Sequence, residues 1–280
     1  MPSKAVLITG CSSGIGHATA SLLVQHGWTV YATARRVETL GELERAGCKT
    51  LALDVTDEAS MSAAVDAVVQ AEGAVGVLIN NAGYSQSGAV ESVPVELVRR
   101  QFETNVVGLI RMCQLVLPGM RSQHRGRIVN LSSMGGRLTF PGGGIYHASK
   151  YAVEAISDAL RFEVRGFGVE VVVIEPGLIV TNFGETAVGS VGETTGDGAY
   201  AGFNRRVAQA VENVYKGPLA RFGAGPEAVA STIAGALTAE RPRTRYPVTA
   251  SARIMMAQRR LLPDRLWDLL MRTQFPVPKQ

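Results

Sequence analysis

The chain has 280 residues, of which 46% are hydrophobic, 19% are charged and 31 are glycine, a composition that suits one large globular α/β domain with an ample core. The three cysteines (Cys11, Cys48 and Cys113) lie too far apart for a disulfide framework or a metal-ligand motif, so we expect no metal and a reduced, cytoplasmic protein. The net charge of +4 comes from residues 250–280, which hold six basic and two acidic residues, whereas the rest of the chain holds 22 of each and shows no basic stripe for nucleic acid.

The start of the chain predicts a dinucleotide-binding unit. An apolar strand over residues 5–9 leads into Gly10, Gly14 and Gly16, and a helical pattern continues to Gln25 and stops at Gly27. Glycines let the backbone approach a pyrophosphate closely, and a helix N-terminus offers it N–H groups and a partial positive charge. The alternative is a tight strand-to-helix turn that binds no ligand.

The second predicted strand bears on the choice of cofactor. It covers residues 28–34 and is followed by Arg35 and Arg36. The strand end is where an acidic residue would hold the ribose 2′-hydroxyl of NAD, and Ala34 occupies that position. Arg35 could instead pair with a 2′-phosphate, which favours NADP over NAD. The alternative is a solvated arginine at a strand end.

Asp54 closes the third predicted strand, residues 50–55. Its carboxylate could accept a hydrogen bond from an adenine amino group. It could equally cap the next helix, predicted over residues 61–70, together with Thr56 and Asp57.

Asparagines mark the next two elements. A fourth strand over residues 75–79 leads into residues 80–83 (Asn-Asn-Ala-Gly), where small residues would let the sheet edge meet a flat ring. A long helix is predicted over residues 95–117 with Asn105 among apolar neighbours. A buried asparagine needs hydrogen-bond partners, so Asn105 is either part of a structural network or part of a proton path.

A strand over residues 127–131 precedes the residues with the clearest chemistry. Ser132 and Ser133 follow it, and Tyr146 and Lys150 lie four apart at the start of a helical pattern, on one face. An ammonium beside a phenol favours the phenolate, so Tyr146 could act as a general acid/base near neutral pH. Ser133 could bind the same substrate oxygen. Such a pair alone is common on exposed helices, and the other motifs favour the functional interpretation.

The last part of the predicted domain contains a poorly patterned segment. A sixth strand, residues 170–174, precedes Pro176 and Gly177. Residues 179–225 read as a substrate loop with a weak helix over residues 203–215. A helix over residues 227–238 and an edge strand over residues 245–249 follow. The alternation predicts a doubly wound parallel sheet of about seven strands that binds ligands at its carboxyl edge.

With these residues assembled, the chain resembles the short-chain dehydrogenase/reductase family over about residues 5–250. The spacing of Ser133 and Tyr146 agrees with that family, and the resemblance implies a Rossmann-type fold. It is carried by Thr9, Gly10, Gly14, Ile15, Gly16, Asp54, Asn80, Asn81, Ala82, Gly83, Asn105, Ser133, Tyr146, Lys150, Pro176, Gly177 and Thr181.

The resemblance also implies roles. Asn105, Ser133, Tyr146 and Lys150 would be catalytic, with Ser133 and Tyr146 binding substrate and Asn105 positioning a water that links Lys150 to solvent. NADP(H), rather than NAD(H), would be the cofactor of an oxidoreductase acting on CH–OH groups. It would be bound by Gly10, Ser12, Ser13, Gly14, Ile15, Gly16, Arg35, Asp54, Val55, Asn81, Ala82, Gly83, Tyr146, Lys150, Pro176, Gly177, Ile179 and Thr181.

The substrate is expected to be a lipophilic alcohol, ketone or aldehyde, such as a steroid, a retinoid or another lipid. The loop offers apolar residues to contact it: Ile179, Phe183, Val188, Val191, Phe203 and Val207. A homodimer or homotetramer is expected. The alternatives are a catalytically silent NADP-sensing regulator and a sugar-nucleotide epimerase or dehydratase on the same scaffold.

Residues 251–280 are predicted to form a separate amphipathic, basic tail after a catalytic domain of residues 1–250. Asp264 could cap a helix with Leu266, Trp267, Leu270 and Met271 on one side and charged residues on the other. Such a helix packs on its own domain or a partner subunit, or lies on a membrane surface. No signal peptide is visible at the N-terminus, and no run reaches the roughly 18 to 20 apolar residues of a membrane span.

Overall fold

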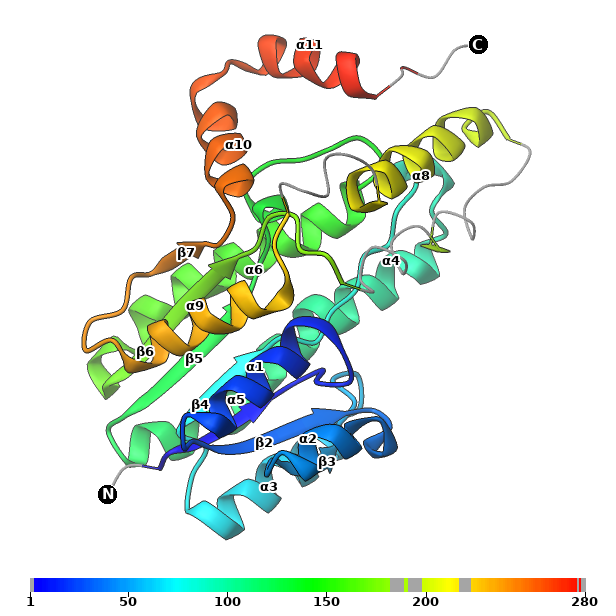
Figure 1. Ribbon diagram of the computed structural model, residues 1–280. Helices are drawn as coiled ribbons and strands as arrows, with labels where there is room; N and C mark the ends of the chain where they lie inside the picture. Colours follow the sequence, from blue (N-terminus) through cyan, green and yellow to red (C-terminus); the bar gives the residue numbers. More distant parts are fainter. Residues whose placement is uncertain (1–2, 182–188, 191–197, 217–222, 276, 278–280) are drawn as a thin grey trace.

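The computed structural model describes residues 3–181, 189–190, 198–216, 223–275 and 277. Its sheet has seven parallel strands. They are β1 (Ala5–Ile8), β2 (Thr29–Ala34), β3 (Lys49–Ala52), β4 (Val77–Asn80), β5 (Gly126–Leu131), β6 (Val169–Glu175) and β7 (Arg245–Pro247). The strand order is β3-β2-β1-β4-β5-β6-β7 (Figure 1), which confirms the predicted doubly wound sheet with its proline-containing strand at the edge.

Helices cover both faces of the sheet (Figure 1). The described helices of the domain are α1 (Gly14–Gln25), α2 (Gly41–Arg45), α3 (Glu58–Glu72), α4 (Val95–Phe102), α5 (Gly108–Ser122), α6 (Gly144–Glu163), α8 (Ala201–Lys216) and α9 (Pro226–Thr238). Short turns complete the framework: η1 (Val37–Leu40), η2 (Val90–Ser92), η3 (Glu103–Val107), η4 (Met134–Gly136) and η5 (Arg165–Phe167).

Two apolar cores lie on opposite faces of the sheet because successive strand side chains alternate in direction. Ile8 and Val129 face the core that α1, α2 and α9 cover. Their chain neighbours Leu7 and Ile128 face the core that α3, α5 and α6 cover. Burial on both faces explains why these strands read as continuous apolar runs.

The predicted helix over residues 95–117 needs correction. The structure has α4, then one π-helical turn (η3), then α5, which ends at Ser122. Asn105 lies in the π turn, a feature that often marks functional sites. Its Nδ2 donates to the Tyr84 carbonyl and to Ser149 Oγ, both at 3.0 Å, and its Oδ1 accepts from the Tyr84 N–H at 3.1 Å. The side chain therefore reaches the interior, where three hydrogen bonds compensate for its burial.

The tail consists of α10 (Ala250–Leu261) and α11 (Asp264–Gln274), which lie at the outer edge of the molecule (Figure 1). Trp267 and Met271 of α11 are buried against Leu138, in the segment between η4 and α6. One face of the tail therefore packs on its own domain, as one of the predicted alternatives had it. Within the described ranges, no helix has the length and apolar character that a bilayer crossing requires.

The expectation that Asp264 caps α11 is wrong. Pro263 occupies the N-cap position and makes no side-chain cap hydrogen bond. Asp264 is the first helical residue, and its carboxylate accepts from Arg259 at 2.7 Å. An acidic residue still complements the helix dipole at this position.

Two glycines in helix interiors predict opposite effects of the same substitution. A Cβ on Gly108 would overlap the Val55 carbonyl oxygen, whereas a Cβ on Gly235 of α9 would meet nothing within 4 Å. We expect Gly108→Ala to lower the free energy of unfolding by about 1–3 kcal/mol and Gly235→Ala to raise it by about 0.5–1 kcal/mol. Urea denaturation measures both. Equal effects of the two substitutions would contradict the close contact at Gly108.

Candidate active site

The site begins where β1 and β4 end side by side. Thr9 Oγ1 accepts from the backbone N–H groups of Asn81 and Ala82, both at 3.0 Å. Asn81 Nδ2 donates back to the carbonyls of Thr9 and Gly10 at 2.9 Å. In the sheet, β2 and β3 lie on one side of β1, and β4 and the strands after it lie on the other. Open α/β sheets bind ligands at such a switch point.

The glycine loop between β1 and α1 has no room for a side chain at Gly10 or Gly16. Gly10 has a φ of +74°, which favours glycine, and its Cβ would lie 2.9 Å from Ala82 Cα. A Cβ on Gly16 would overlap the Gly10 carbonyl oxygen. Ser13 makes no side-chain cap hydrogen bond at the N-terminus of α1, and no acidic residue lies in the first turn. This exposed helix N-terminus fits an anion such as a pyrophosphate.

Lys150 is buried beneath this edge of the sheet. Its Nζ donates to the Leu131 carbonyl at the end of β5 at 2.7 Å. The same Nζ lies 5.9 Å from the centroid of the Tyr146 ring, one helical turn earlier in α6. Burial lowers the pKa of Lys150 to about 8, although the Glu154 carboxylate acts to raise it. The amine therefore remains largely protonated at neutral pH.

Gly83 lies over the Lys150 amine. A Cβ at this position would lie 3.1 Å from Asn105 Oδ1 and 3.7 Å from Lys150 Nζ. Gly83 is exposed, whereas Asn105 and Lys150 are buried beneath it. Ser149 Oγ, which accepts from Asn105, donates to the Tyr146 carbonyl at 2.7 Å. Asn105 thus supports the first turn of α6, and its predicted role in positioning a water stays a prediction.

Ser133 lies at the start of η4 and is partly exposed. Its Oγ accepts from the Gly135 N–H at 3.0 Å, which leaves the hydroxyl proton free to donate elsewhere. A Cβ on Gly135 would lie 3.4 Å from this Oγ and 2.6 Å from the ring of His147. Gly135 therefore separates Ser133 from the residue that follows Tyr146.

His147 has a structural role that the sequence analysis missed. Its buried ring is enclosed by Gly135 and Gly143, and its Nδ1 accepts from the Phe140 N–H at 3.2 Å. Burial lowers its pKa to about 4, so the ring is neutral at physiological pH. The segment between Ser133 and Tyr146 is thus wrapped around a neutral imidazole. The glycines around this histidine were the only signal available in the sequence.

The predicted cofactor residues Arg35 and Asp54 follow β2 and β3, at the carboxyl edge of the sheet. Arg35 is exposed directly after β2, where it can reach a ligand. Asp54 lies two residues after β3, and its Oδ1 accepts from the Thr56 N–H and hydroxyl at 2.9 and 2.8 Å. The helix cap on α3 is made by Asp57. Asp54 therefore shapes the turn, and the predicted adenine contact stays a prediction.

The segment after β6 closes the edge. The Pro176 carbonyl accepts from the Met134 N–H at 2.8 Å, which ties this segment to η4. Ile179 is buried, and Thr181 lies 3.5 Å from where a Cβ of Gly14 would be. The predicted pocket residues Phe183, Val188 and Val191 lie outside the described residues. Phe203 and Val207 of α8, also predicted to line the pocket, are buried against Ala89, so their side chains are already covered by the protein.

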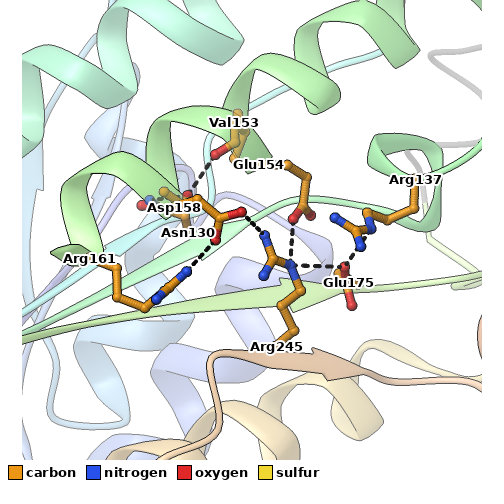
Figure 2. A network of polar contacts seen from close by, with 9 residues as sticks. Asn130, Arg137, Val153, Glu154, Asp158, Arg161, Glu175 and Arg245 are labelled. Carbon is orange, nitrogen blue, oxygen red and sulfur yellow. Dashed lines mark hydrogen bonds and ion pairs between the residues drawn. The ribbon is translucent and has the colours of Figure 1, made fainter.

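A network of charged residues, of which Glu154 and Glu175 are buried, supports the site from behind (Figure 2). Arg245 of β7 donates to Glu154 of α6 at 2.9 Å and to Asp158 at 2.7 Å, and lies 3.6 Å from Glu175 at the end of β6. Arg137 lies 3.8 Å from Glu175. The sequence analysis gave Glu154 and Arg245 no role. Glu154 follows Lys150 by four residues on the same helix face, which was a usable signal.

Glu175 predicts a dependence of stability on pH. Burial raises its pKa from 4.5 to about 7, and repulsion by Glu154 adds to this effect. Between these values the folded state holds a proton that the unfolded state has released, so the free energy of unfolding falls as pH rises through this window. We expect Glu175→Gln to abolish this slope, a contribution on the order of 1–3 kcal/mol. Urea denaturation across the window measures it, with the exposed Glu163→Gln as control. Parallel pH profiles for wild type and Glu175→Gln would contradict the assignment.

The chain is similar in sequence to known oxidoreductases. Residues 4–189 match a family model described as short chain dehydrogenase. The uncharacterised oxidoreductase YbbO of Escherichia coli (strain K12) is 37% identical, over 96% of this chain and 94% of its own. The 3-ketodihydrosphingosine reductase of Bacteroides thetaiotaomicron is 35% identical, over 99% of this chain and 100% of its own. The NADPH-dependent 3-dehydrocapnine reductase of Ornithobacterium rhinotracheale is 35% identical, over 94% of each chain.

Solved structures share the fold over nearly the whole chain. A short-chain dehydrogenase from Streptomyces avermitilis has a TM-score of 0.80 and 34% identity, over 96% of this chain and 94% of that one. A serine dehydrogenase complexed with NADP+ has a TM-score of 0.76 and 28% identity, over 88% and 95%. A short chain dehydrogenase/reductase from Burkholderia phymatum in complex with NAD has a TM-score of 0.77 and 25% identity, over 99% and 97%.

Proposed function

The chain belongs to the short-chain dehydrogenase/reductase family, and we propose that it interconverts a hydroxyl and a carbonyl group on a lipid-like substrate, with NADP(H) as cofactor. The observation that carries this proposal is the buried Lys150 amine beside the Tyr146 ring, under the exposed Gly83. A cation beside a phenol, at a ligand-binding sheet edge, is what proton transfer to or from a substrate oxygen requires.

Each residue of the site has a separate role in the proposed reaction. NADP(H), when bound, supplies the hydride in reduction and accepts it in oxidation. Tyr146 gives its phenolic proton to the substrate oxygen in reduction and takes the hydroxyl proton in oxidation. The Ser133 hydroxyl donates to the same oxygen and stabilises the charge that develops there. The Lys150 ammonium favours the tyrosinate, and Asn105 holds the first helical turn that carries Tyr146.

The residues at the sheet edge fit a dinucleotide. The Gly10–Gly16 loop and the N-terminus of α1 would hold the pyrophosphate, since the turn packs too tightly for side chains at Gly10 and Gly16 and no acidic residue lies in the first turn. Arg35 would pair with the 2′-phosphate, and Gly83 would leave room for the nicotinamide ribose beside Lys150. The NADPH-dependent relative and the NADP+ complex support this choice.

A lipid-like substrate is supported by one relative and by the apolar composition of the cluster that packs α8 on the domain. Helix α8 buries Phe203 and Val207 against Ala89, and Asn204 fixes the helix there by accepting from the Ala89 N–H at 2.9 Å. The Bacteroides relative is named as a reductase of 3-ketodihydrosphingosine. Measuring NADPH consumption with a panel of long-chain ketones, steroids and retinal tests this substrate class. Turnover confined to short polar carbonyls would contradict it.

We further propose a cytoplasmic homodimer or homotetramer whose catalytic unit spans residues 1–250, followed by a tail of residues 251–280. The elements of the site lie before this division, and α10 begins at it. Sedimentation of the purified chain measures the number of subunits. A monomer with full activity would contradict the oligomer.

Tyr146→Phe tests the chemistry. Removing the phenolic hydroxyl abolishes proton transfer, so we expect kcat to fall by about 10²–10⁴ while NADPH still binds. Steady-state kinetics and NADPH fluorescence titration measure the two quantities. Tyr151→Phe, on the exposed side of the same helix, is the matched control and should retain activity. A Tyr146→Phe variant that kept more than about a tenth of the wild-type kcat would favour the silent NADP-sensing alternative or another acid.

Arg35→Gln tests the cofactor preference. Because the guanidinium would pair with the 2′-phosphate alone, we expect the KM for NADPH to rise about tenfold or more and the KM for NADH to stay unchanged. Arg45→Gln on α2, another exposed arginine nearby, should change neither value. An equal rise for both cofactors would show that Arg35 acts on the loop rather than on the phosphate.

A further inference from the structure

The tail helices have an apolar outer surface that the proposed reaction does not use. On α11, Leu266 and Leu269 are 51% and 59% exposed, although Trp267 and Met271 of the same helix are buried. On α10, Ile254 and Leu261 are 57% and 80% exposed. We call these four residues the outer tail surface.

The spacing of these residues puts them on continuous helix faces. Leu266 and Leu269 are three residues apart, and Ile254 and Leu261 are seven apart, so each pair lies along one side of its helix. A helix that only covers its own domain is expected to be polar on the side that faces water. Here the outer side of each helix carries two large apolar residues as well as charged ones, so the outer side is suited to a second contact.

The charges around the outer tail surface are mainly positive. Arg253, Arg260, Arg265 and Arg272 are all exposed. Of the two acidic residues in the tail, Asp264 is already paired with Arg259 at 2.7 Å. Residues 250–280 also account for the whole net charge of the protein. Exposed leucines flanked by arginines match the interface of a bilayer that contains anionic lipids. In a symmetric contact between two copies of this surface, the arginines would repel one another.

The outer tail surface lies next to the site. Trp267 and Met271 pack on Leu138, and the Phe275 ring lies 6.2 Å from that of Phe140. Leu138 and Phe140 belong to the segment between Ser133 and Tyr146. Only the thickness of α11, about 10 Å, separates Leu266 and Leu269 of the outer tail surface from this segment. Figure 1 shows α11 at the margin of the molecule, beyond the sheet.

We propose that the outer tail surface docks on an anionic lipid bilayer and holds the active site close to a substrate dissolved in that bilayer. The leucines insert at the headgroup boundary, and the arginines bind the anionic headgroups. The delivery of substrate rests on the proposed function, whereas the docking itself does not.

Co-sedimentation of the full chain with vesicles tests the docking. We expect binding to vesicles of phosphatidylserine and phosphatidylcholine, weaker binding to phosphatidylcholine alone, and release at high salt. Leu266→Gln/Leu269→Gln keeps the net charge and should weaken binding to the anionic vesicles about tenfold or more. Arg260→Gln/Arg265→Gln should weaken binding and reduce its salt dependence.

Matched controls lie at the opposite, amino-terminal edge of the sheet. Phe162→Gln removes an apolar side chain that is 81% exposed, and Arg125→Gln/Arg165→Gln removes two exposed arginines. Both controls should bind the vesicles like wild type. Circular dichroism and the NADPH-dependent reduction of a short, water-soluble ketone show that each variant is folded.

Three results would overturn the docking proposal. In the first, the wild-type protein stays in the supernatant when anionic vesicles are sedimented. In the second, the tail variants bind the vesicles as well as the wild type does. In the third, the protein forms a dimer without lipid, and only the leucine variant dissociates it. Vesicle binding by a protein that oxidises no NADPH would instead refute the proposed function and leave the docking intact. The converse result, full activity on a soluble ketone without vesicle binding, would refute the docking alone.

Discussion

The hydrogen bond from the buried Lys150 ammonium to the Leu131 carbonyl is the contact on which the rest of the site depends. A buried cation is costly unless its environment compensates for lost water. The carbonyl at the end of β5 supplies one acceptor, and the Glu154 carboxylate, one turn further along α6, supplies negative potential. The bond fixes α6 relative to the sheet, and with it the tyrosine one turn earlier. The charge to which we assign a role in proton transfer therefore also sets the position of the helix.

Polar side chains inside the apolar sheet fix how β4, β5 and α6 lie relative to one another. Asn80 of β4 donates to Asn130 of β5 at 2.9 Å, and Asn130 donates to Ser157 of α6 at 2.9 Å. Each such group would be costly if unpaired, so the network admits one register between these three elements. Arg245 adds a second constraint from β7, where it joins α6 to the end of β6. The site is thus held by directional bonds on both sides of Lys150.

How much could be predicted from the sequence depends on how far apart along the chain the interacting residues lie. The strands came from local apolar runs, and Tyr146 and Lys150 came from spacing on one helix, so both could be read directly. The π turn at Asn105 could not, because it depends on the main chain of Tyr84, 21 residues earlier. The spacing of Glu154 from Lys150 could draw attention to Glu154, but its pairing with Arg245 spans 91 residues and had no local signal. A sequence therefore suggests candidate residues by their chemical type and local spacing, whereas residues that act through distant tertiary contacts leave little local signal.

The tail packs on the segment between Ser133 and Tyr146, and this contact determines how the tail can be studied. Phe140 contacts the ring of Phe275 on one side and that of His147 on the other, at centroid distances of 6.2 and 5.7 Å. His147 in turn borders Gly135, next to Ser133. Deleting residues 251–280 would expose Leu138 and remove one wall of this segment, so lost activity in a truncated protein would not distinguish a missing membrane contact from a loosened site. Substitutions on the outer face of α11 leave the Trp267 and Met271 packing intact, and they separate the two roles.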